Sequence, residues 1–193
     1  YIKKEGTITP TITSTWKMLE PKDQVVIYYT NDVHTYIDGA LSYDNIAALK
    51  DETATWASGV LLVDAGDHVQ GTAYGAMDNG ETIIKLMNAA GYDAATLGNH
   101  EFDNGLEELA RRLKSVKCPV VCANYDFSPF ELGRYVRPYT IVRKAGLKIG
   151  IFGLLTDITT VVDRTIADRI PKFDDIETAN KWAAWLKESE KCD

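Results

Sequence analysis

The sequence predicts an α/β fold built from strand–helix–strand units, and three observations point to it. Short apolar runs at 25–30, 60–63 and 93–97 are spaced about one strand–helix unit apart. Apolar residues at helical spacing lie between these runs, and each run ends in a polar cluster. Buried apolar strands that alternate with helices are typical of a parallel sheet with right-handed crossovers.

The first strand–helix pairs can be placed from residue types alone. The β-branched and aromatic run 25–30 is expected to be a buried strand. Ser42 is placed to cap a helix, and Gly59 ends that helix before the strand 60–63.

The same pattern then repeats. A helix over 83–90 is closed by Gly91, and the strand 93–97 follows it. Asn104 can cap the next helix, which leads to a strand over 119–123. Between the second strand and its helix we expect a loop that lacks the pattern of a phosphate-binding loop and contains Gly71, Gly75 and Gly80.

The pattern changes after residue 124. The runs 139–143 and 147–153 flank a short turn and predict an antiparallel hairpin. A last helix is expected to pack through one apolar face that contains Ile176, Ala179, Ala183 and Leu186.

The chain is expected to contain one domain, preceded by an arm. Residues 1–22 are Thr-rich and contain two prolines, so we expect an arm or linker with one short edge strand at Thr7–Thr13. Residues 23–193 form the domain. The chain begins with Tyr and has no signal peptide, so we expect a processed or excised piece of a longer protein.

Composition excludes several classes of protein. The 193 residues are 45% hydrophobic and 25% charged, which is typical of a globular domain with a real core. The net charge is −7 and no Lys/Arg block stands out, so the chain lacks an electrostatic footprint for nucleic acid or an anionic membrane. The apolar runs are too short to span a bilayer.

The three cysteines are expected to be buried free thiols. Cys118 and Cys122 lie in one predicted strand, where four residues span roughly 13 Å. A disulfide needs Cα atoms within about 7 Å, so these two should not pair with each other. Cys192 could pair with either, but burial as free thiols is favoured.

The three histidines all lie in polar clusters at the ends of predicted strands. These clusters are 30–34, 64–68 and 98–103. Right-handed crossovers place the carboxyl ends of parallel strands at one edge of the sheet, where α/β sheets bind ligands. The side chains that we expect to converge at this edge are Asp32, His34, Asp67, Asn99 and His100.

This set of side chains predicts a metal site. Oxygen and nitrogen ligands without thiolate suit Mn, Zn, Fe or Ni better than Ca or a structural zinc. Asp32 and His34 would point to the same face if their segment is extended. Asp67 is the central carboxylate and could bridge two ions, and a two-metal site can activate water and neutralise a phosphoryl group. We therefore expect a metal-dependent phosphoester hydrolase.

Each cluster alone also has an ordinary explanation as a solvated loop, a turn or a helix cap. Their repetition at three successive strand ends favours a site. Three neighbouring polar residues are given structural roles instead. We expect His68 to face solvent rather than bind a metal, Asp64 to brace its loop by hydrogen bonds, and Asn124 to form a turn.

The motifs resemble the calcineurin-like metallophosphoesterases and, within them, the 5'-nucleotidase family. The matching stretches are 29–34, 61–67, 95–103 and 122–124, together with the later hairpin. The resemblance covers residues 24–190 and implies a sheet sandwich of the calcineurin-like type, built from βαβ units.

The resemblance also implies two divalent ions, such as Mn, Zn or Fe, in the parent enzyme. In the family, the Asp and His of the first motif bind one ion, so the resemblance assigns this role to Asp32 and His34. The Asp of the second motif bridges both ions in the family, and this role is assigned to Asp67. The Asn of Gly-Asn-His binds the other ion, and this role is assigned to Asn99.

The family's catalytic pair is carried over in the same way. The His beside the ligand Asn is not a metal ligand but stabilises the transition state, which places His100. An Asp three residues further on orients it, which places Asp103. Asn99 and His100 are also the expected substrate contacts.

Two departures from the family pattern matter. Thr35 stands where the family usually has Gly, so this loop is expected to differ in shape. The family supplies three more metal-ligand histidines downstream, but no histidine follows His100 here. We therefore expect a truncated enzyme domain, incomplete at the C-terminus. This piece should hold one ion weakly or none and show negligible turnover.

The parent is expected to be a 5'-nucleotidase-like phosphomonoester hydrolase that uses a metal-activated water. The alternatives are another phosphoesterase of the superfamily, such as a cyclic phosphodiesterase, UDP-sugar hydrolase or thiosulfate-ester hydrolase, or a non-catalytic binding domain.

The expected partners and location also follow from the resemblance. The partners are a nucleotide or other phosphoester and a missing C-terminal substrate-binding domain. An extracellular, periplasmic or cell-surface location is implied, and self-association is expected through the sheet edge that the truncation leaves exposed.

Overall fold

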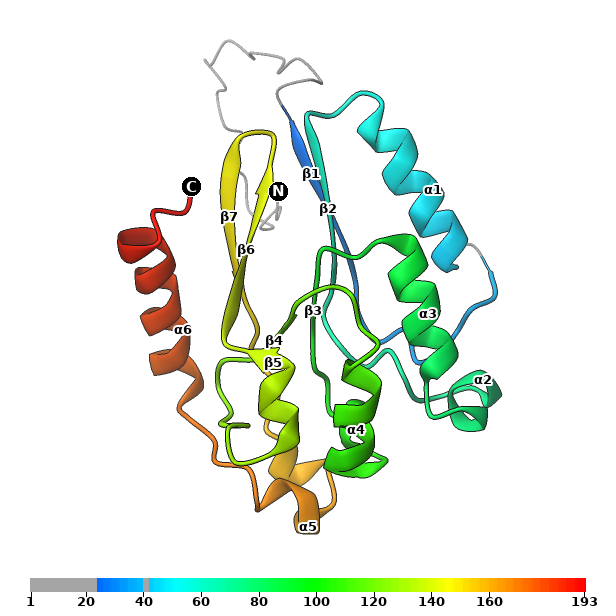
Figure 1. The fold of residues 1–193 in the computed structure, drawn as a ribbon, viewed down its shortest axis with the longest axis vertical. Coiled ribbons are helices and arrows are strands. Elements are labelled where there is room, and N and C mark those ends of the chain that lie inside the picture. The colour runs from blue at the N-terminus through cyan, green and yellow to red at the C-terminus, as the bar shows by residue number, and fades with distance from the viewer. Residues whose placement is uncertain (1–23, 40–41) are drawn as a thin grey trace, which may run out of the picture.

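A computed structural model describes residues 24–39 and 42–193 (Figure 1). The predicted arm over residues 1–22, with its strand at Thr7–Thr13, lies outside the described residues.

Strands and helices alternate along the first part of the chain. The strands are β1 (Val25–Thr30), β2 (Gly59–Asp64), β3 (Ala94–Thr96), β4 (Val120–Val121), β5 (Val136–Arg137), β6 (Tyr139–Lys144) and β7 (Leu147–Phe152). The helices are α1 (Tyr43–Ala54), α2 (Ala73–Met77), α3 (Glu81–Ala90), α4 (Gly105–Leu113), α5 (Arg164–Ala167) and α6 (Asp175–Ala184). Short 3-10 turns cover His100–Phe102, Glu131–Arg134 and Ile158–Thr160, and a π-helical turn, Trp185–Ser189, follows α6.

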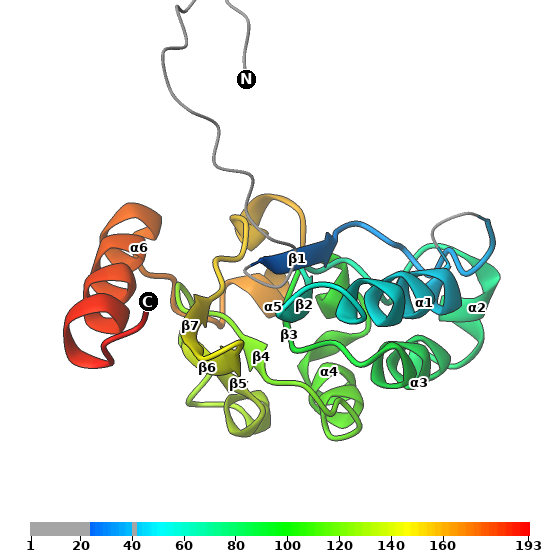
Figure 2. The same cartoon turned by 90° about the horizontal axis from the view of Figure 1, so that it is seen from above.

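The architecture is the predicted α/β one, with a parallel sheet. Five parallel strands follow the order β1-β2-β3-β4-β5, and β6 and β7 form a separate antiparallel pair. Seen from above, α1 and α3 lie next to each other beside the parallel sheet, and α6 lies at the opposite end, beyond β6 and β7 (Figure 2). No helix within the described residues is long and apolar enough to cross a membrane.

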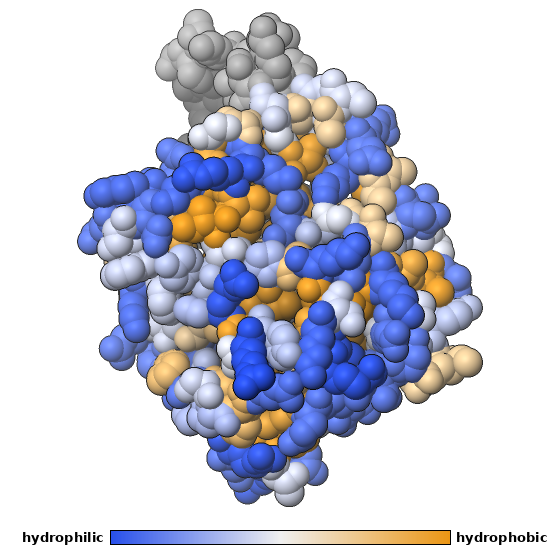
Figure 3. All heavy atoms as spheres, viewed as in Figure 1, coloured by the Kyte–Doolittle hydropathy of each residue, from blue (hydrophilic) through white to orange (hydrophobic). Residues whose placement is uncertain are grey.

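The core forms two clusters that flank the site-bearing strands. In one of them, α3 buries Ile83, Ile84 and Met87 with Leu62 of β2 and Ala95 of β3. The other cluster surrounds α4 and the segments that follow it; its largest fully buried side chains are Leu97, Phe102, Leu109, Leu132 and Ile158. On the outside, apolar patches show between larger hydrophilic areas (Figure 3).

The prediction that β1 is a buried strand was wrong. β1 lies at the edge of the sheet, and Ile27 and Tyr29 are 57% and 74% exposed. These two side chains alternate along the strand and therefore share one face, which the described residues leave uncovered. The interior strand β2, in contrast, buries Val60, Leu61 and Leu62.

The helix boundaries agree with the predicted capping positions, but the capping chemistry differs. α1 begins after Ser42 and α4 after Asn104, yet in the described structure neither side chain makes a capping hydrogen bond. The Ser42 hydroxyl donates to Asp44 instead. Gly91 ends α3 with φ of +71°, as expected of a glycine in the left-handed region. The predicted glycine-rich loop contains the short helix α2, which was not predicted from the sequence.

The packed face of the last helix overlaps the predicted one only in part. Leu186 is buried and Ala179 half-buried as predicted, but Ile176 is 75% exposed and Ala183 is exposed. Thr178, which was not predicted, is buried. Trp182 lies on the buried side, with its ring 5.0 Å from that of Tyr139 in β6. Which side chains of α6 are buried therefore depends on the face that meets the β6–β7 pair. This long-range contact cannot be inferred from the periodicity of the helix.

The hairpin and the unpaired cysteines agree with the sequence. β6 and β7 are joined by Ala145 and Gly146, both with positive φ, which suits a tight hairpin turn. All three cysteines, which lie within the described residues, are free. Only Cys122 is fully buried, while Cys118 and Cys192 are half-buried.

Candidate metal-binding and catalytic site

The three polar clusters meet at the carboxyl ends of β1, β2 and β3. Backbone hydrogen bonds join the first two loops: the Asp32 amide donates to the Gly66 carbonyl at 3.1 Å, and the His34 amide donates to the Asp67 carbonyl at 2.9 Å. The third loop joins through the backbone amide of His100, which donates to Asp67 Oδ1 at 2.8 Å. Parallel strand order thus brings together segments that are far apart in sequence.

Asp32, His34 and Asp67 form a possible metal-binding cluster. Each offers one ligand atom, and these atoms lie within 4.8 Å of one another. His34 Nε2 lies 3.4 Å from Asp32 Oδ1. Two carboxylates and one imidazole form a donor set that suits Mn, Zn or Fe. The residues present therefore fit a divalent ion, and Asn99 lies next to the cluster because it directly precedes His100.

The tautomer of His34 is set by its second ring nitrogen. His34 Nδ1 lies 2.9 Å from the carbonyl oxygen of Gln70. Because a carbonyl oxygen only accepts, Nδ1 carries the proton and Nε2 keeps its lone pair in the neutral ring. Nε2 is therefore the nitrogen available to a metal.

The first loop is not extended, contrary to the prediction about Asp32 and His34. Asp32, His34 and Thr35 have φ values of +54°, +47° and +58°, and Asp67 in the second loop has +56°. Residues other than glycine rarely adopt this left-handed conformation, and such strain concentrates at functional sites. The two side chains converge through a tight left-handed turn, which residue spacing alone does not reveal.

Glycines allow the loops to approach this closely. A Cβ on Gly98 would collide with the carboxylate of Asp67, and a Cβ on Gly66 would collide with the backbone of Gly98. Gly66 also has a φ of +97°. Both positions therefore need glycine for space.

His100 and Asp103 form a hydrogen-bonded pair beside the metal cluster. His100 Nδ1 lies 2.8 Å from Asp103 Oδ2. The rings of His100 and His34 meet edge to face with centroids 5.0 Å apart. The hydrogen bond to Asp103 is the main cause that raises the pKa of His100, and the charges of Asp103, Asp67 and Glu101 raise it further. This pair favours a protonated imidazole.

The electrostatics around Asp67 favour a cation. Burial raises the pKa of the Asp67 carboxyl, and the hydrogen bond from the His100 amide offsets only part of this rise. The charges of Glu101 and Asp32 raise it further. A bound cation would relieve the repulsion among these carboxylates.

Glu101 is a supporting residue that sequence reasoning missed. Its fully buried carboxylate joins two loops: Oε2 accepts from the amides of Asp67 at 2.9 Å and Gly98 at 2.5 Å. Oε1 accepts from the His68 amide at 2.9 Å. The only signal in the sequence is an acidic residue inside the third cluster.

Asp64 braces its loop as predicted, but His68 does not face solvent. Asp64 accepts hydrogen bonds from the Thr30 hydroxyl and the Gly66 amide, and His68 Nδ1 lies 2.8 Å from its carboxylate. His68 is 3% exposed and is not part of the metal-binding cluster. Burial alone would lower the pKa of His68, but Glu101 and Asp64 outweigh it and raise the pKa to about 9. The two carboxylates therefore favour the protonated form of the buried His68.

Asn124 is a buried clamp rather than a turn residue. Its Nδ2 donates to the Leu155 carbonyl and to Asp175, both at 2.7 Å, and its Oδ1 accepts from the Leu155 amide at 2.9 Å. Asn124 thus joins the end of β4 to the segment after β7 and to the start of α6.

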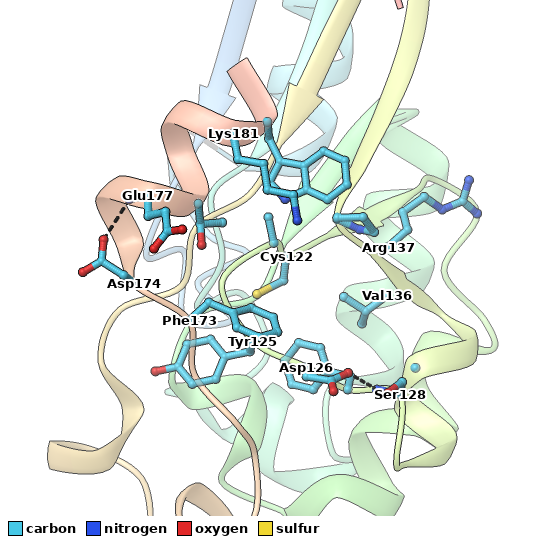
Figure 4. Close-up of a pocket in the computed structure, with 16 residues that line it drawn as sticks. Cys122, Tyr125, Asp126, Ser128, Val136, Arg137, Phe173, Asp174, Glu177 and Lys181 are labelled. Carbon is cyan, nitrogen blue, oxygen red and sulfur yellow. Dashed lines mark hydrogen bonds between the residues drawn. The ribbon is translucent and has the colours of Figure 1, made fainter. Parts of the chain in front are cut away.

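Two hollows lie near these elements. A cavity of about 430 Å³ between the end of β4 and α6 is lined by Cys122, Tyr125, Phe173 and Lys181, among others (Figure 4). None of the six expected site residues, all of which the structure describes, lines this cavity. A mainly apolar groove of about 510 Å³ borders Asp32 instead and contains Tyr29 and Leu49.

The parallel α/β sheet has Asp, His and Asn residues at the carboxyl ends of three successive strands, which is the arrangement expected of a phosphoesterase. The family model for calcineurin-like phosphoesterases matches residues 25–192. The chain therefore belongs to the calcineurin-like phosphoesterase family.

Individual relatives support this assignment. The chain is 36% identical to a snake venom 5'-nucleotidase of Gloydius brevicauda over 156 residues, which cover 72% of this chain and 26% of the relative. It is 30% identical to the trifunctional nucleotide phosphoesterase protein YfkN of Bacillus subtilis over 207 residues, covering 89% of this chain and 14% of the relative.

A solved structure shows the same fold. The crystal structure of a 5'-nucleotidase precursor from Thermus thermophilus superposes with a TM-score of 0.77 at 31% identity. The superposition covers 86% of this chain and 35% of that protein. The chain thus spans well under half the length of each of these relatives.

Proposed function

We propose that this chain is the N-terminal part of a metal-dependent, 5'-nucleotidase-like phosphomonoesterase that converts a nucleotide into a nucleoside and phosphate. The observation that carries the proposal is the cluster of Asp32, His34 and Asp67 with the His100–Asp103 pair beside it. The names of the venom and Thermus relatives support the nucleotide substrate.

The donor atoms at the strand ends would hold divalent ions such as Mn, Zn or Fe. Asp32, His34 and Asp67 would hold one ion, and Asp67 and Asn99 would contribute to a second. When bound, such ions supply Lewis-acid polarisation of a phosphoryl oxygen and activation of water.

His100 would act directly on the phosphoryl group. Asp103 engages Nδ1, so the opposite nitrogen, Nε2, is free to donate a hydrogen bond. The raised pKa keeps the ring protonated at higher pH than that of a free histidine. A fixed positive donor of this kind stabilises negative charge that develops on a phosphoryl oxygen. Asn99 is proposed as the second contact to the substrate.

A Mn²⁺ titration of this chain, followed by electron paramagnetic resonance, tests the metal site. We expect one weak site, because three ligands lie together in the described residues. Asp67→Asn should abolish binding, whereas Asp168→Asn, an exposed carboxylate after α5, should leave it unchanged. Failure of the wild-type chain to bind Mn²⁺ would contradict the proposed site.

Phosphate release from AMP tests the activity. The expected result for this chain is negligible turnover, and Mn²⁺-dependent turnover is expected from a longer protein that contains it. Absence of turnover in the longer protein with bound Mn²⁺ would favour a non-catalytic binding domain.

A second candidate is a phosphoesterase with a different or broader substrate range. The observation that favours it is the relative named a trifunctional nucleotide phosphoesterase. A panel of AMP, a cyclic nucleotide and a UDP-sugar, assayed with the longer protein, distinguishes the two. A secreted, periplasmic or cell-surface location is proposed as well, because one relative is a venom protein.

A further inference from the structure

Thr35 adopts a backbone conformation that its side chain disfavours. It is fully buried and has a φ of +58°, and a β-branched residue in this region is a true outlier. Glycine would adopt this φ without strain, but threonine does not. Something must therefore hold Thr35 in place.

Thr72, the residue before α2, makes reciprocal hydrogen bonds with Thr35. The Thr72 amide donates to Thr35 Oγ1 at 2.7 Å, and Thr72 Oγ1 donates to the Thr35 carbonyl at 3.0 Å. The two hydroxyl oxygens are 2.7 Å apart. Since the Thr72 hydroxyl donates its proton to the Thr35 carbonyl, the Thr35 hydroxyl must donate to the Thr72 oxygen, which closes a ring of hydrogen bonds.

The segment before and after Thr72 fits tightly around His34 and Thr35. A Cβ on Gly71 would lie 2.8 Å from the Cβ of His34, and a Cβ on Gly75 would lie 2.5 Å from the γ-methyl of Thr35. Gln70 begins this segment, and its carbonyl accepts from His34 Nδ1. The same segment thus contacts the imidazole of His34 and the backbone that carries it.

We propose that Thr35 and Thr72 form a latch that positions His34 as a metal ligand. The latch fixes the backbone of 70–72 against the strained turn, which keeps the exposed Gln70 carbonyl on Nδ1. This contact selects the tautomer in which Nε2 faces Asp32 and is open to a metal. The inference rests on the proposed function, because it assumes that His34 binds a metal.

Thr72→Val tests the latch because it keeps the side-chain volume and removes the hydroxyl. We expect Mn²⁺ to bind roughly 10- to 100-fold more weakly, the usual effect of removing support behind a ligand. In metal-free protein, ring ¹⁵N shifts of His34 should change from one tautomer to a mixture. Thr72→Ser should restore both properties, and Thr35→Val should act like Thr72→Val.

Thr53→Val is the matched control. Thr53 is also buried, and its hydroxyl bonds to the hydroxyl of Tyr28 at 2.8 Å, in α1 rather than at the site. It should lower stability without changing the Mn²⁺ affinity or the His34 tautomer.

The outcomes separate the latch from the proposed function. Wild-type affinity and an unchanged tautomer in Thr72→Val would overturn the latch. Loss of folding in both latch variants, while Thr53→Val folds, would also overturn it in favour of a purely structural role. If the wild type itself fails to bind Mn²⁺, the proposed function fails, and the tautomer measurement still decides whether the latch orients His34.

Discussion

Glu101 supports the candidate site by accepting hydrogen bonds from the backbone amides of the loops that form it. Its carboxylate accepts amide hydrogens from both the second and the third loop. A buried acceptor that serves several donors cannot be removed without leaving those donors unsatisfied. Its position inside a charged motif hides this role from sequence reasoning.

Glu101→Gln should therefore destabilise the protein by about 2–3 kcal/mol, since its amide nitrogen would face backbone N–H groups. Urea unfolding measures the change. Glu107→Gln, at an exposed position of α4, is the control and should alter the free energy of unfolding by less than about 0.5 kcal/mol. Equal stability of the two variants would contradict the role given to Glu101.

His68 predicts a pH dependence of stability. Its pKa of about 9 in the folded protein lies above the ordinary value of 6.5, so folding favours the protonated form. The resulting stabilisation is fully present below pH 6.5 and is lost as the pH rises towards 9. Unfolding free energies of metal-free protein, measured in EDTA, should fall over this interval.

His68→Gln provides the comparison for this prediction. The variant should be less stable than the wild type at a pH just below 6.5, and it should lose most of the decline between pH 6.5 and about 9. A decline as steep as that of the wild type would assign the pH dependence to another group, such as His100, whose pKa is raised in the same direction.

Asn124 connects three elements of the fold. It bonds to Leu155 after β7 and to Asp175 in the first turn of α6. The orientation of α6 therefore depends on one amide side chain at the end of β4.

Asn124→Ala should lower stability by about 2–3 kcal/mol, because buried partners lose their hydrogen bonds. Hydrogen exchange in α6 should accelerate more than exchange in α3. Asn104→Ala is the matched control, since within the described structure its side chain caps no helix amide. Uniform acceleration across α3 and α6 would show a global effect rather than a clamp.

At the surface of the molecule, β1 forms one edge of the parallel sheet, and its outer side is not paired with another strand in the described chain. Exposed Ile27 and Tyr29 lie on this strand, and an open apolar edge can pair with another copy. The self-association expected from the sequence was assigned to the edge left by truncation and remains a prediction; β1 is a different edge, and we propose it as a second location for self-association.

Tyr29→Lys should reduce self-association at high concentration, because a charge on an edge strand opposes pairing. Light scattering as a function of concentration measures this. Tyr74→Lys, at an exposed aromatic residue of α2, should leave association unchanged. A monomeric wild type at the highest concentration would remove the basis for the prediction.

Several local features could be predicted because they depend on neighbouring residues. Gly91 ends α3, the Ala145–Gly146 turn joins a hairpin, and polar clusters follow β2 and β3. Strand order and burial could not be predicted in the same way. The exposed face of β1 and the packed face of α6 depend on which distant elements meet them.

The α/β class, the parallel strands and the residues at their carboxyl ends could all be inferred from the amino-acid sequence alone. Periodicity and capping signals involve residues close together in the sequence, so they can be read directly from it. The right-handed crossover is a general rule of parallel sheets, and it predicts where the strand ends lie once the strands are known. The way in which the loops support one another became visible only in the folded chain. The left-handed turn at Asp32–Thr35, the buried roles of Glu101 and His68, and the Asn124 clamp arise from contacts between distant segments, which no local pattern encodes.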